Sequence, residues 1–207
     1  TDAFEASYGG AEANVAVSLA VLKDPVSFVT KLPENPVGTA ALNEVRRYGA
    51  DTSKVVIGGS RLGIYFFEKG TDIRPTNVVY DREGSALALA KPEEFHWDEI
   101  LKDTDIFYFS GVTPAVSENI AKAVLEALKY CKAHGIETVC DLNYRSKMWD
   151  TKKAQSVMSE LMNYVTLCIA NDEDFESSLG IHAYDGDISK GIDQIESYKA
   201  GMKEIQN

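Results

Sequence analysis

Basic runs and long apolar runs are both missing from this 207-residue sequence, which carries 32 acidic against 21 basic residues and a formal net charge of -11. Without a basic stretch, nucleic acid and anionic membrane surfaces are poor partners. No apolar run approaches the roughly 20 residues of a membrane-spanning helix, and no signal peptide opens the chain. We therefore expect a cytoplasmic protein that binds neither nucleic acid nor membrane.

Cysteine is also scarce. Cys131, Cys140 and Cys168 form an odd set, with no C-x-x-C spacing and no Cys/His metal-binding pattern. This argues against a zinc site and against a disulfide framework. We expect three reduced thiols that pack in the core.

The opening segment runs from two glycines into an apolar helix. Gly9 and Gly10 can take positive φ and let a ligand lie against bare backbone N–H groups at the helix start. Asn14 offers one donor and one acceptor, a good match for a sugar hydroxyl. Residues 15–22 contain a single polar side chain, which predicts a helix enclosed nearly all round. A tight turn with a helix cap and no ligand explains these residues equally well. A dinucleotide fingerprint is disfavoured because its third glycine is missing.

The first half of the chain changes character at Asp51. Before it we expect a strand over residues 26–29, a proline-bracketed loop over 31–36 and a helix over about 37–48. After it, three β-rich runs at 54–57, 61–69 and 77–82 predict an antiparallel sheet. Apolar side chains alternate onto both faces of the middle run, so we expect both faces to be covered, one of them by another copy of the chain.

The second half alternates strands with helices. We expect strands over residues 105–110, 138–143 and 166–171, and helices from 114 to about 134, over 151–164 and over 172–179, with a loop and an amphipathic helix after residue 182. Polar residues gather where strands end, and in an open parallel sheet those ends form the ligand crevice. The residues concerned are Ser110, Thr113, Asp141, Asn143, Arg145, Asn171 and Asp174.

Five segments, taken in order, resemble the ribokinase-like (PfkB) carbohydrate kinases: GGAEANVA at 9–16, RLGIY at 61–65, VYDREGSA at 79–86, SGVTPA at 110–115 and DLNYR at 141–145. The resemblance implies an α/β fold, a doubly wound and mostly parallel sheet with a small antiparallel β-sheet lid. It places an incomplete kinase core at residues 1–52 and 91–207 and the lid at 53–90.

The resemblance also implies transfer of the ATP γ-phosphoryl group to a hydroxyl of a six-carbon keto-deoxy acid, with Mg²⁺. Arg82 would bind the substrate carboxylate, a role that suits the bidentate geometry of arginine. The alternatives without a ligand-binding role are that Arg82 is a solvated charge on a strand and that Tyr65 and Tyr80 pack in the core of the lid. The implied substrate-binding residues are Gly10, Asn14, Tyr65, Tyr80, Arg82, Val112 and Arg145, and those near the nucleotide are Asn143, Tyr144 and Arg145.

Two departures from the family pattern matter. The N-x-x-E motif, which helps to organise magnesium, is found here as Asn171 to Asp174, with aspartate in the glutamate position. The G-A-G-D motif, which supplies the anion hole and the catalytic base, is absent from the 207 residues, as is the family's first strand. We therefore expect missing ends, no catalytic base in this chain and no turnover by it alone. A kinase of a neutral sugar, such as a fructokinase, and a non-catalytic sugar-binding protein remain open.

Overall fold

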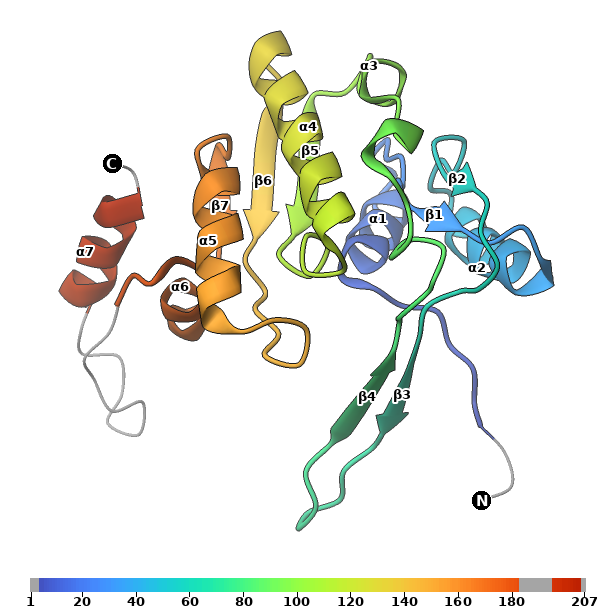
Figure 1. Ribbon diagram of the computed structural model, residues 1–207, viewed down its shortest axis with the longest axis horizontal. Coiled ribbons are helices and arrows are strands. Elements are labelled where there is room, and N and C mark those ends of the chain that lie inside the picture. The colour runs from blue at the N-terminus through green and yellow to red at the C-terminus, as the bar shows by residue number, and fades with distance from the viewer. Residues whose placement is uncertain (1–3, 183–194, 206–207) are drawn as a thin grey trace. The chain divides into compact units, whose positions relative to one another are not determined.

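The computed structural model describes residues 4–182 and 195–205 and contains two compact units (Figure 1). The first unit is Thr1–Ile100 with Val116–Ala123. The second is Leu101–Ala115 with Val124–Asn207. Each unit is described in turn.

The first unit is built on two helices and one short parallel strand pair. Helix α1 (Ala11–Val21) packs against α2 (Pro36–Arg46), and β1 (Lys31–Leu32) pairs with β2 (Val56–Ile57). Helix α2 begins where the sequence predicts it, because Pro36 presets the first turn and the Asn35 side chain accepts the Gly38 N–H at 2.9 Å. A Cβ at Gly38 would lie 2.0 Å from the Pro33 carbonyl oxygen, so only glycine fits there.

Two strand predictions in this unit are wrong. Residues 26–29 form only an isolated bridge between Ser27 and Asp51, and the ladder starts instead at Lys31, inside the predicted loop. The partner segment turns between Thr52 and Val55, which interrupts the pairing. The run at 54–57 does not join the antiparallel sheet, because Val56 and Ile57 pair with β1 in parallel. A short β-branched run fits either sheet, and its choice of partner depends on distant residues.

Helix α1 is less enclosed than its apolar sequence predicts. Ala16 is its single buried residue, whereas Val21 and Leu22 are 60% and 72% exposed. The prediction of enclosure nearly all round is therefore wrong for this chain. The physical reason is that α2 packs against α1 along one side only, and the described residues leave its last turn open to solvent.

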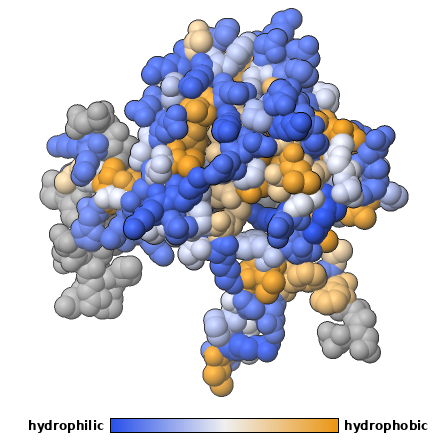
Figure 2. Space-filling view, in the orientation of Figure 1, coloured by the Kyte–Doolittle hydropathy of each residue, from blue (hydrophilic) through white to orange (hydrophobic). Residues whose placement is uncertain are grey.

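A β-hairpin follows, made of β3 (Ile64–Glu68) and β4 (Asn77–Asp81), and it extends away from α1 and α2 in Figure 1. The expected turn is present: Thr71 and Arg74 exchange backbone hydrogen bonds of 3.0 and 2.8 Å. Every residue of β3 is exposed, and Figure 2 shows hydrophobic side chains on the hairpin surface. Described residues cover it only in part: the Phe4 ring lies 5.8 Å from that of Phe66, and Gly9 lies close to the Tyr65 hydroxyl. The predicted burial of both faces is therefore not reached among the described residues.

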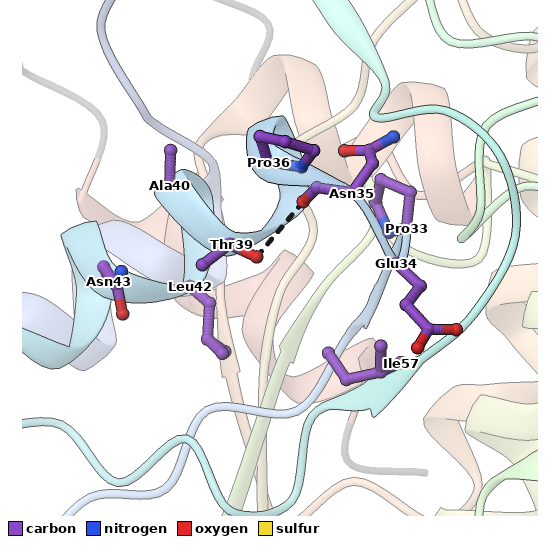
Figure 3. Close-up of a pocket in the computed structure, with 9 residues that line it drawn as sticks. All are labelled: Pro33, Glu34, Asn35, Pro36, Thr39, Ala40, Leu42, Asn43 and Ile57. Carbon is purple, nitrogen blue, oxygen red and sulfur yellow. Dashed lines mark hydrogen bonds between the residues drawn. The ribbon is translucent and has the colours of Figure 1, made fainter.

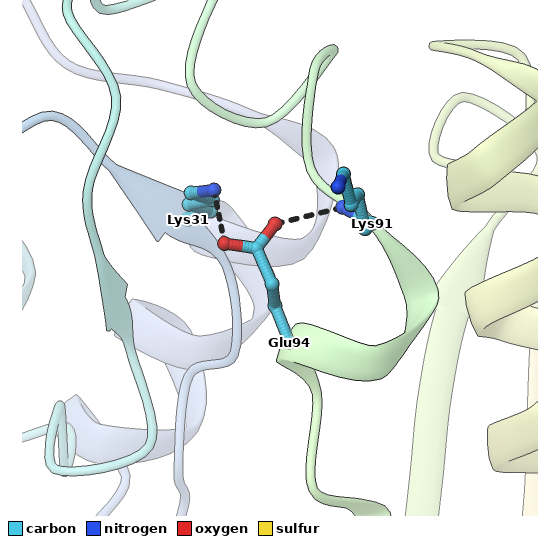
Figure 4. A network of polar contacts seen from close by, with 3 residues as sticks. All are labelled: Lys31, Lys91 and Glu94. Carbon is cyan, nitrogen blue, oxygen red and sulfur yellow. Dashed lines mark hydrogen bonds and ion pairs between the residues drawn. The ribbon is translucent and has the colours of Figure 1, made fainter.

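A polar network ties β1 to the turn of 3₁₀ helix η1 (Pro92–Glu94), which precedes the short α3 (Trp97–Ile100) (Figure 4). Glu94 pairs through Oε1 with the Lys31 ammonium and accepts the Lys91 N–H at Oε2, at 2.8 Å. The hydrogen bond from Lys31, followed by that from Lys91, lowers the pKa of Glu94. Because the Lys31 side chain is only 10% exposed, this ion pair is shielded from water.

The second unit is a parallel sheet in the order β5-β6-β7, as the alternation predicts. Its strands are β5 (Ile106–Ser110), β6 (Glu137–Asp141) and β7 (Leu167–Ile169). Its helices are the later part of α4 (Glu118–His134), then α5 (Thr151–Met162), α6 (Asp172–Leu179) and α7 (Ile195–Ile205). Phe109, Leu128 and Leu142 are among its fully buried side chains. The loop expected after residue 182 lies outside the described residues over 183–194.

Helix α4 begins four residues later than the proline at 114 predicts. Residues 111–115 form turns, and the helix starts after Ser117, whose hydroxyl accepts the Ile120 N–H at 3.3 Å. A serine in this position satisfies a backbone donor that the first turn leaves open. The capping chemistry of Ser117 therefore outweighs the preset backbone of Pro114.

The three thiols are free, as expected. Cys131 and Cys140 are buried and Cys168 is half-buried. Burial raises the pKa of Cys131 to about 11, and burial with the nearby charges of Asp141 and Asp174 raises the pKa of Cys168 to about 11. Among the described residues, no helix has both the length and the apolar character needed to cross a membrane.

Candidate functional site

The strand register of the hairpin assembles an aromatic and arginine cluster, defined as Tyr65, Tyr80 and Arg82. Tyr65 lies opposite Tyr80, and the ring centroids are 6.3 Å apart in an edge-on arrangement. The guanidinium carbon of Arg82 lies 4.6 Å from the Tyr80 ring centroid and 5.8 Å from that of Tyr65. Three residues that the sequence analysis assigned to the lid therefore meet on one face, where two aromatic rings support a cation.

The glycine segment before α1 meets this cluster. A Cβ built on Gly9 would lie 3.2 Å from the Tyr65 hydroxyl and 3.9 Å from Asn14 Oδ1. At Gly10 the same atom would meet nothing closer than the Ala13 Cβ at 3.7 Å, an ordinary contact. The sequence analysis chose Gly10 for the substrate floor, whereas Gly9 is the glycine with a close neighbour. The sequence feature that could have pointed to Gly9 is the adjacent pair of glycines.

Positive φ is not what these glycines supply. Gly10 has φ 161°, extended backbone that any residue adopts, and Gly9 is not among the glycines with positive φ. The freedom to take positive φ is therefore not used here, because the chain enters α1 in an extended conformation. What the glycine pair contributes is an absent side chain, which lets the Tyr65 hydroxyl approach the backbone.

Arg61 holds the strand end that carries Arg82. Its Nη2 lies 2.7 Å from Asp81 Oδ2 and donates to the Asp81 carbonyl at 3.0 Å, while Nη1 donates to the Glu83 carbonyl at 3.0 Å. The sequence analysis quoted Arg61 within a motif but gave it no role, because its partners lie about 20 residues away. The alternative for Arg82 is that it is only a solvated charge beside Asp81. The Asp81 carboxylate is paired with Arg61 instead, which weighs against that alternative.

In the second unit, the ends of β5 and β6 lie side by side, with Ser110 in register with Asp141. The Gly111 N–H donates to the Asp141 carbonyl at 2.8 Å, and a Cβ on Gly111 would lie 2.1 Å from the Leu142 carbonyl oxygen. Glycine is therefore required at position 111. The Val112 N–H donates to Ser110 Oγ at 3.3 Å, which holds this predicted substrate residue at the C-terminal ends of the strands.

Asp174 anchors the segment that follows β6. Its Oδ1 accepts the Tyr144 N–H at 2.9 Å, and its own N–H donates to Asn171 Oδ1 at 2.8 Å. Asn143 has φ 38°, a left-handed conformation that asparagine tolerates better than most residues. The Arg145 guanidinium donates to the Tyr144 carbonyl at 2.9 Å. The predicted crevice residues Asn143, Tyr144, Arg145 and Asp174 are thus brought together.

No cluster of metal ligands is present at these strand ends among the described residues. Within residues 4–182 and 195–205, no three His, Cys, Asp or Glu side chains gather as metal ligands would. One oxygen of Asp174, which is 9% exposed, is used by a backbone N–H. No reaction step is therefore assigned to a metal held by these residues, and an indirect contact from Asp174 stays a prediction.

A surface hollow of about 720 Å³ lies elsewhere, at the start of α2 (Figure 3). Pro33, Asn35, Pro36 and Ile57 are among its lining residues. Its polar atoms serve the helix cap: Asn35 Nδ2 donates to the Ser60 carbonyl at 3.1 Å, and Thr39 Oγ1 donates to the Asn35 carbonyl at 3.1 Å. No predicted site residue lines this hollow, so it is not our candidate site.

A family profile described as pfkB family carbohydrate kinase matches residues 1–205. The chain belongs to this family. The structure also superposes on 2-dehydro-3-deoxygluconokinase from Thermotoga maritima with a TM-score of 0.92 and 44% identity, over 100% of this chain and 60% of that one. The predicted family and the ribokinase-like α/β fold are thereby confirmed.

Two further proteins are similar to this chain. The 2-dehydro-3-deoxygalactonokinase of Haloferax volcanii is 37% identical over 86% of this chain and 55% of its own length. A Pyrococcus horikoshii sugar kinase crystallised with ATP has a TM-score of 0.68 at 23% identity, over 77% of this chain and 52% of that one, and shows the fold alone. The chain thus spans little more than half the length of these relatives.

The pfkB assignment leaves the predicted residues in two groups. Asn14, Tyr65, Tyr80, Arg82 and the glycine pair gather in the first unit. Val112, Asn143, Tyr144, Arg145 and Asp174 gather at the strand ends of the second. Their individual roles stay predictions.

Proposed function

We propose that this chain carries the sugar-acid site and lid of a cytoplasmic, ATP-dependent kinase that phosphorylates 2-keto-3-deoxygluconate, giving 2-keto-3-deoxy-6-phosphogluconate. The observation that carries the proposal is the Arg82 guanidinium, which lies over the Tyr80 ring at 4.6 Å beside Tyr65 and the glycine segment. A site that presents a cation together with hydroxyl and amide groups suits a ligand with one carboxylate and several hydroxyls.

The roles divide by chemistry. Arg82 binds the carboxylate, because a guanidinium can donate two parallel hydrogen bonds to it. The hydroxyls of Tyr65 and Tyr80 and the amide of Asn14 bind sugar hydroxyls, each acting as donor or acceptor. Gly10, next to the close approach at Gly9, leaves room for the sugar against the backbone. For Val112 and Arg145, which belong to the second unit, a substrate contact is proposed from the family resemblance alone.

The phosphoryl donor is ATP. Asn143, Tyr144 and Arg145 lie near its phosphates, and a fixed arginine there offsets the charge that develops during transfer. Mg²⁺ would supply positive charge that offsets the phosphates of the nucleotide, and Asp174 would contact it only indirectly. Among the described residues, none is assigned as the base that removes the proton from the accepting hydroxyl.

The choice of epimer rests on the relatives. The Thermotoga maritima protein, 44% identical, is named for the gluconate form, and the Haloferax volcanii protein, 37% identical, for the galactonate form. The two sugar acids differ in configuration at one carbon. The nearer similarity supports the gluconate epimer.

The test measures ATP-dependent phosphorylation by the native protein, with 2-keto-3-deoxygluconate, 2-keto-3-deoxygalactonate, gluconate and fructose as acceptors. We expect the highest kcat/KM with 2-keto-3-deoxygluconate. Arg82→Ala should raise its KM by more than about tenfold, since a charge-assisted hydrogen bond is lost, while the KM for ATP stays unchanged. A preference for fructose would favour a neutral-sugar kinase. Sugar binding without any ADP formation would favour a non-catalytic sugar-binding protein.

A further inference from the structure

We infer that Arg61 is a positioning residue for Arg82: it fixes the backbone on both sides of Arg82 and pairs with the Asp81 carboxylate, and so sets the preference for acidic sugars. The inference rests on the proposed function in one respect, that Arg82 receives the substrate carboxylate. Arg61 itself is not placed against substrate.

The first argument is geometric. Arg61 donates to the carbonyl oxygens of Asp81 and Glu83, the residues directly before and after Arg82, both at 3.0 Å. The chain also closes on itself around this point, because the Ala86 N–H donates to the Arg61 carbonyl at 2.8 Å. The Arg82 carbonyl also accepts the Ser85 N–H at 3.1 Å, so the Arg61 bonds act together with this turn to hold the Arg82 backbone.

The second argument is electrostatic. Asp81 Oδ2 lies 2.7 Å from Arg61 Nη2, and Asp81 is adjacent to Arg82 in sequence. Asp81 lies opposite Ile64 and so on the other face of β4 from Tyr80. Without Arg61 its carboxylate would remain uncompensated one residue from Arg82, and its negative charge would weaken the attraction of an acidic substrate. The ion pair is only partly exposed, with 37% of the Arg61 side chain and 46% of the Asp81 side chain accessible, so water screens it incompletely.

The third argument is the choice of residue. One guanidinium serves a carboxylate and two carbonyls here, which uses the forked donor set of arginine. A lysine has a single ammonium, which can keep the ion pair with Asp81 but loses the hydrogen bonds to the backbone carbonyls of Asp81 and Glu83. Lysine at position 61 therefore separates the electrostatic role from the geometric one.

The same hairpin offers a matched control. Arg74 pairs with Glu68 at 3.1 Å near the turn, and both side chains are more exposed, at 63% and 54%. This pair has the same chemistry and lies on the same two-stranded element. No hydrogen bond between Arg74 and the backbone next to Arg82 is found among the described residues, so Arg74→Ala should leave substrate binding unchanged.

The kinetic experiment uses the native protein with 2-keto-3-deoxygluconate and ATP. Arg61→Ala should raise the KM for the sugar acid by about tenfold, with kcat and the KM for ATP within about twofold, because a charge-assisted contact is weakened and the reacting groups are untouched. Arg61→Lys should lie between wild type and Arg61→Ala. The double variant Arg61→Ala with Asp81→Ala should recover part of the loss.

Coupling to Arg82 gives the sharpest outcome. In an Arg82→Ala background, adding Arg61→Ala should change the sugar-acid KM by less than about twofold, because the two residues act through one contact. An unchanged KM in Arg61→Ala would overturn the inference. A full further loss in the Arg82→Ala background would also overturn it, as would the absence of recovery in the Asp81 double variant.

A second readout does not depend on the proposed function. Phenylglyoxal labels the neutral form of arginine, and a neighbouring carboxylate stabilises the charged form. Labelling of Arg82, followed by peptide mass spectrometry without any ligand, should slow several-fold in Arg61→Ala and recover in the double variant. Equal labelling rates in all variants would contradict the inference even if the kinase assay succeeds.

If the wild-type protein shows no preference for acidic sugars while the labelling follows this pattern, the proposed function fails and the positioning role stands.

Discussion

The β3–β4 hairpin and the β5-β6-β7 sheet hold their site residues in different ways. In the hairpin every residue of β3 is exposed, and Tyr65, Tyr80 and Arg82 are ordered by contacts between side chains. At the sheet edge, Tyr144 is held through its backbone N–H by Asp174, a buried carboxylate. The sheet thus has a core beneath its site, whereas the hairpin is held by its own side chains, by the Arg61 contacts and by the few contacts of Phe4 and Gly9.

The difference indicates how each site can respond to a ligand. A region with few buried apolar contacts opens at low free-energy cost, and binding loops are commonly drawn from such regions. A close-packed region resists displacement, since its side chains interlock. We therefore expect the hairpin to adapt to the sugar acid, and the strand ends to keep their geometry with or without nucleotide.

Truncating one apolar side chain in each region gives the largest expected effect. Leu128 of α4 is fully buried in the second unit, while Phe67 of β3 is 61% exposed. Leu128→Ala should lower the free energy of unfolding by about 2–5 kcal/mol, from lost burial and a new cavity. Phe67→Ala should change it by less than about 0.5 kcal/mol. Urea denaturation measures both, and equal losses would contradict the contrast between the two regions.

Asp174 provides the next test. Asp174→Ala leaves the Tyr144 N–H without its partner, which should cost about 1–3 kcal/mol of stability. Asp174→Asn keeps an acceptor oxygen and should cost less. Hydrogen exchange at the Tyr144 amide should accelerate in the alanine variant and much less in the asparagine variant. If exchange at Tyr144 is unaffected, the backbone is not held in the way that the 2.9 Å contact indicates.

Local patterns predicted much of this fold. The alternation of apolar strands with helices located β5, β6 and β7, and the helix over 172–179 matches α6 from Asp172 to Leu179. The two runs of β-branched and aromatic residues on either side of Gly70 predicted the hairpin correctly. These features depend on neighbours in sequence, which is why periodicity and turn residues reveal them.

Features that depend on distant partners were missed. The pairing of Val56 with Lys31 in a parallel ladder joins residues 25 positions apart, and nothing in either run specifies the other. The close contact between Gly9 and Tyr65 and the bonds from Arg61 to Asp81 and Glu83 arise in the same way. Sequence reasoning selected the residue types at the candidate site, but only the fold brings out the residues that support them.

A smaller effect is expected at the Glu94 network of the first unit. The pKa of Glu94 is lowered from 4.5 in the fold, so its charged form contributes stability above about pH 4.5, and this contribution is lost as the pH falls through the lowered value. Glu94→Gln should cost about 1 kcal/mol at pH 7, and the difference from wild type should disappear in acid. Thermal unfolding across pH 3–7 measures this, with Glu93→Gln as the control. A constant difference at every pH would rule out the charge as its cause.

The smallest effect on stability is expected when charges are placed on the hairpin face that carries Ile64, Phe66 and Val79. The same charges should change the molecular mass in solution. We propose that this face binds a second copy of the chain, because Ile64 and Phe66 are 44% and 46% exposed beside Val79 at 53%, and sheet faces and edges of this kind are usually covered. Ile64→Glu and Phe66→Glu should change the unfolding free energy by less than about 0.5 kcal/mol, since neither side chain is in the core. They should nevertheless lower the mass measured by light scattering. Lys69→Glu, directly after the same strand, changes charge without removing an apolar side chain and should leave the mass unchanged. A protein that is monomeric before and after substitution would contradict the binding of a second copy at this face, which is the face opposite Tyr65 and Tyr80.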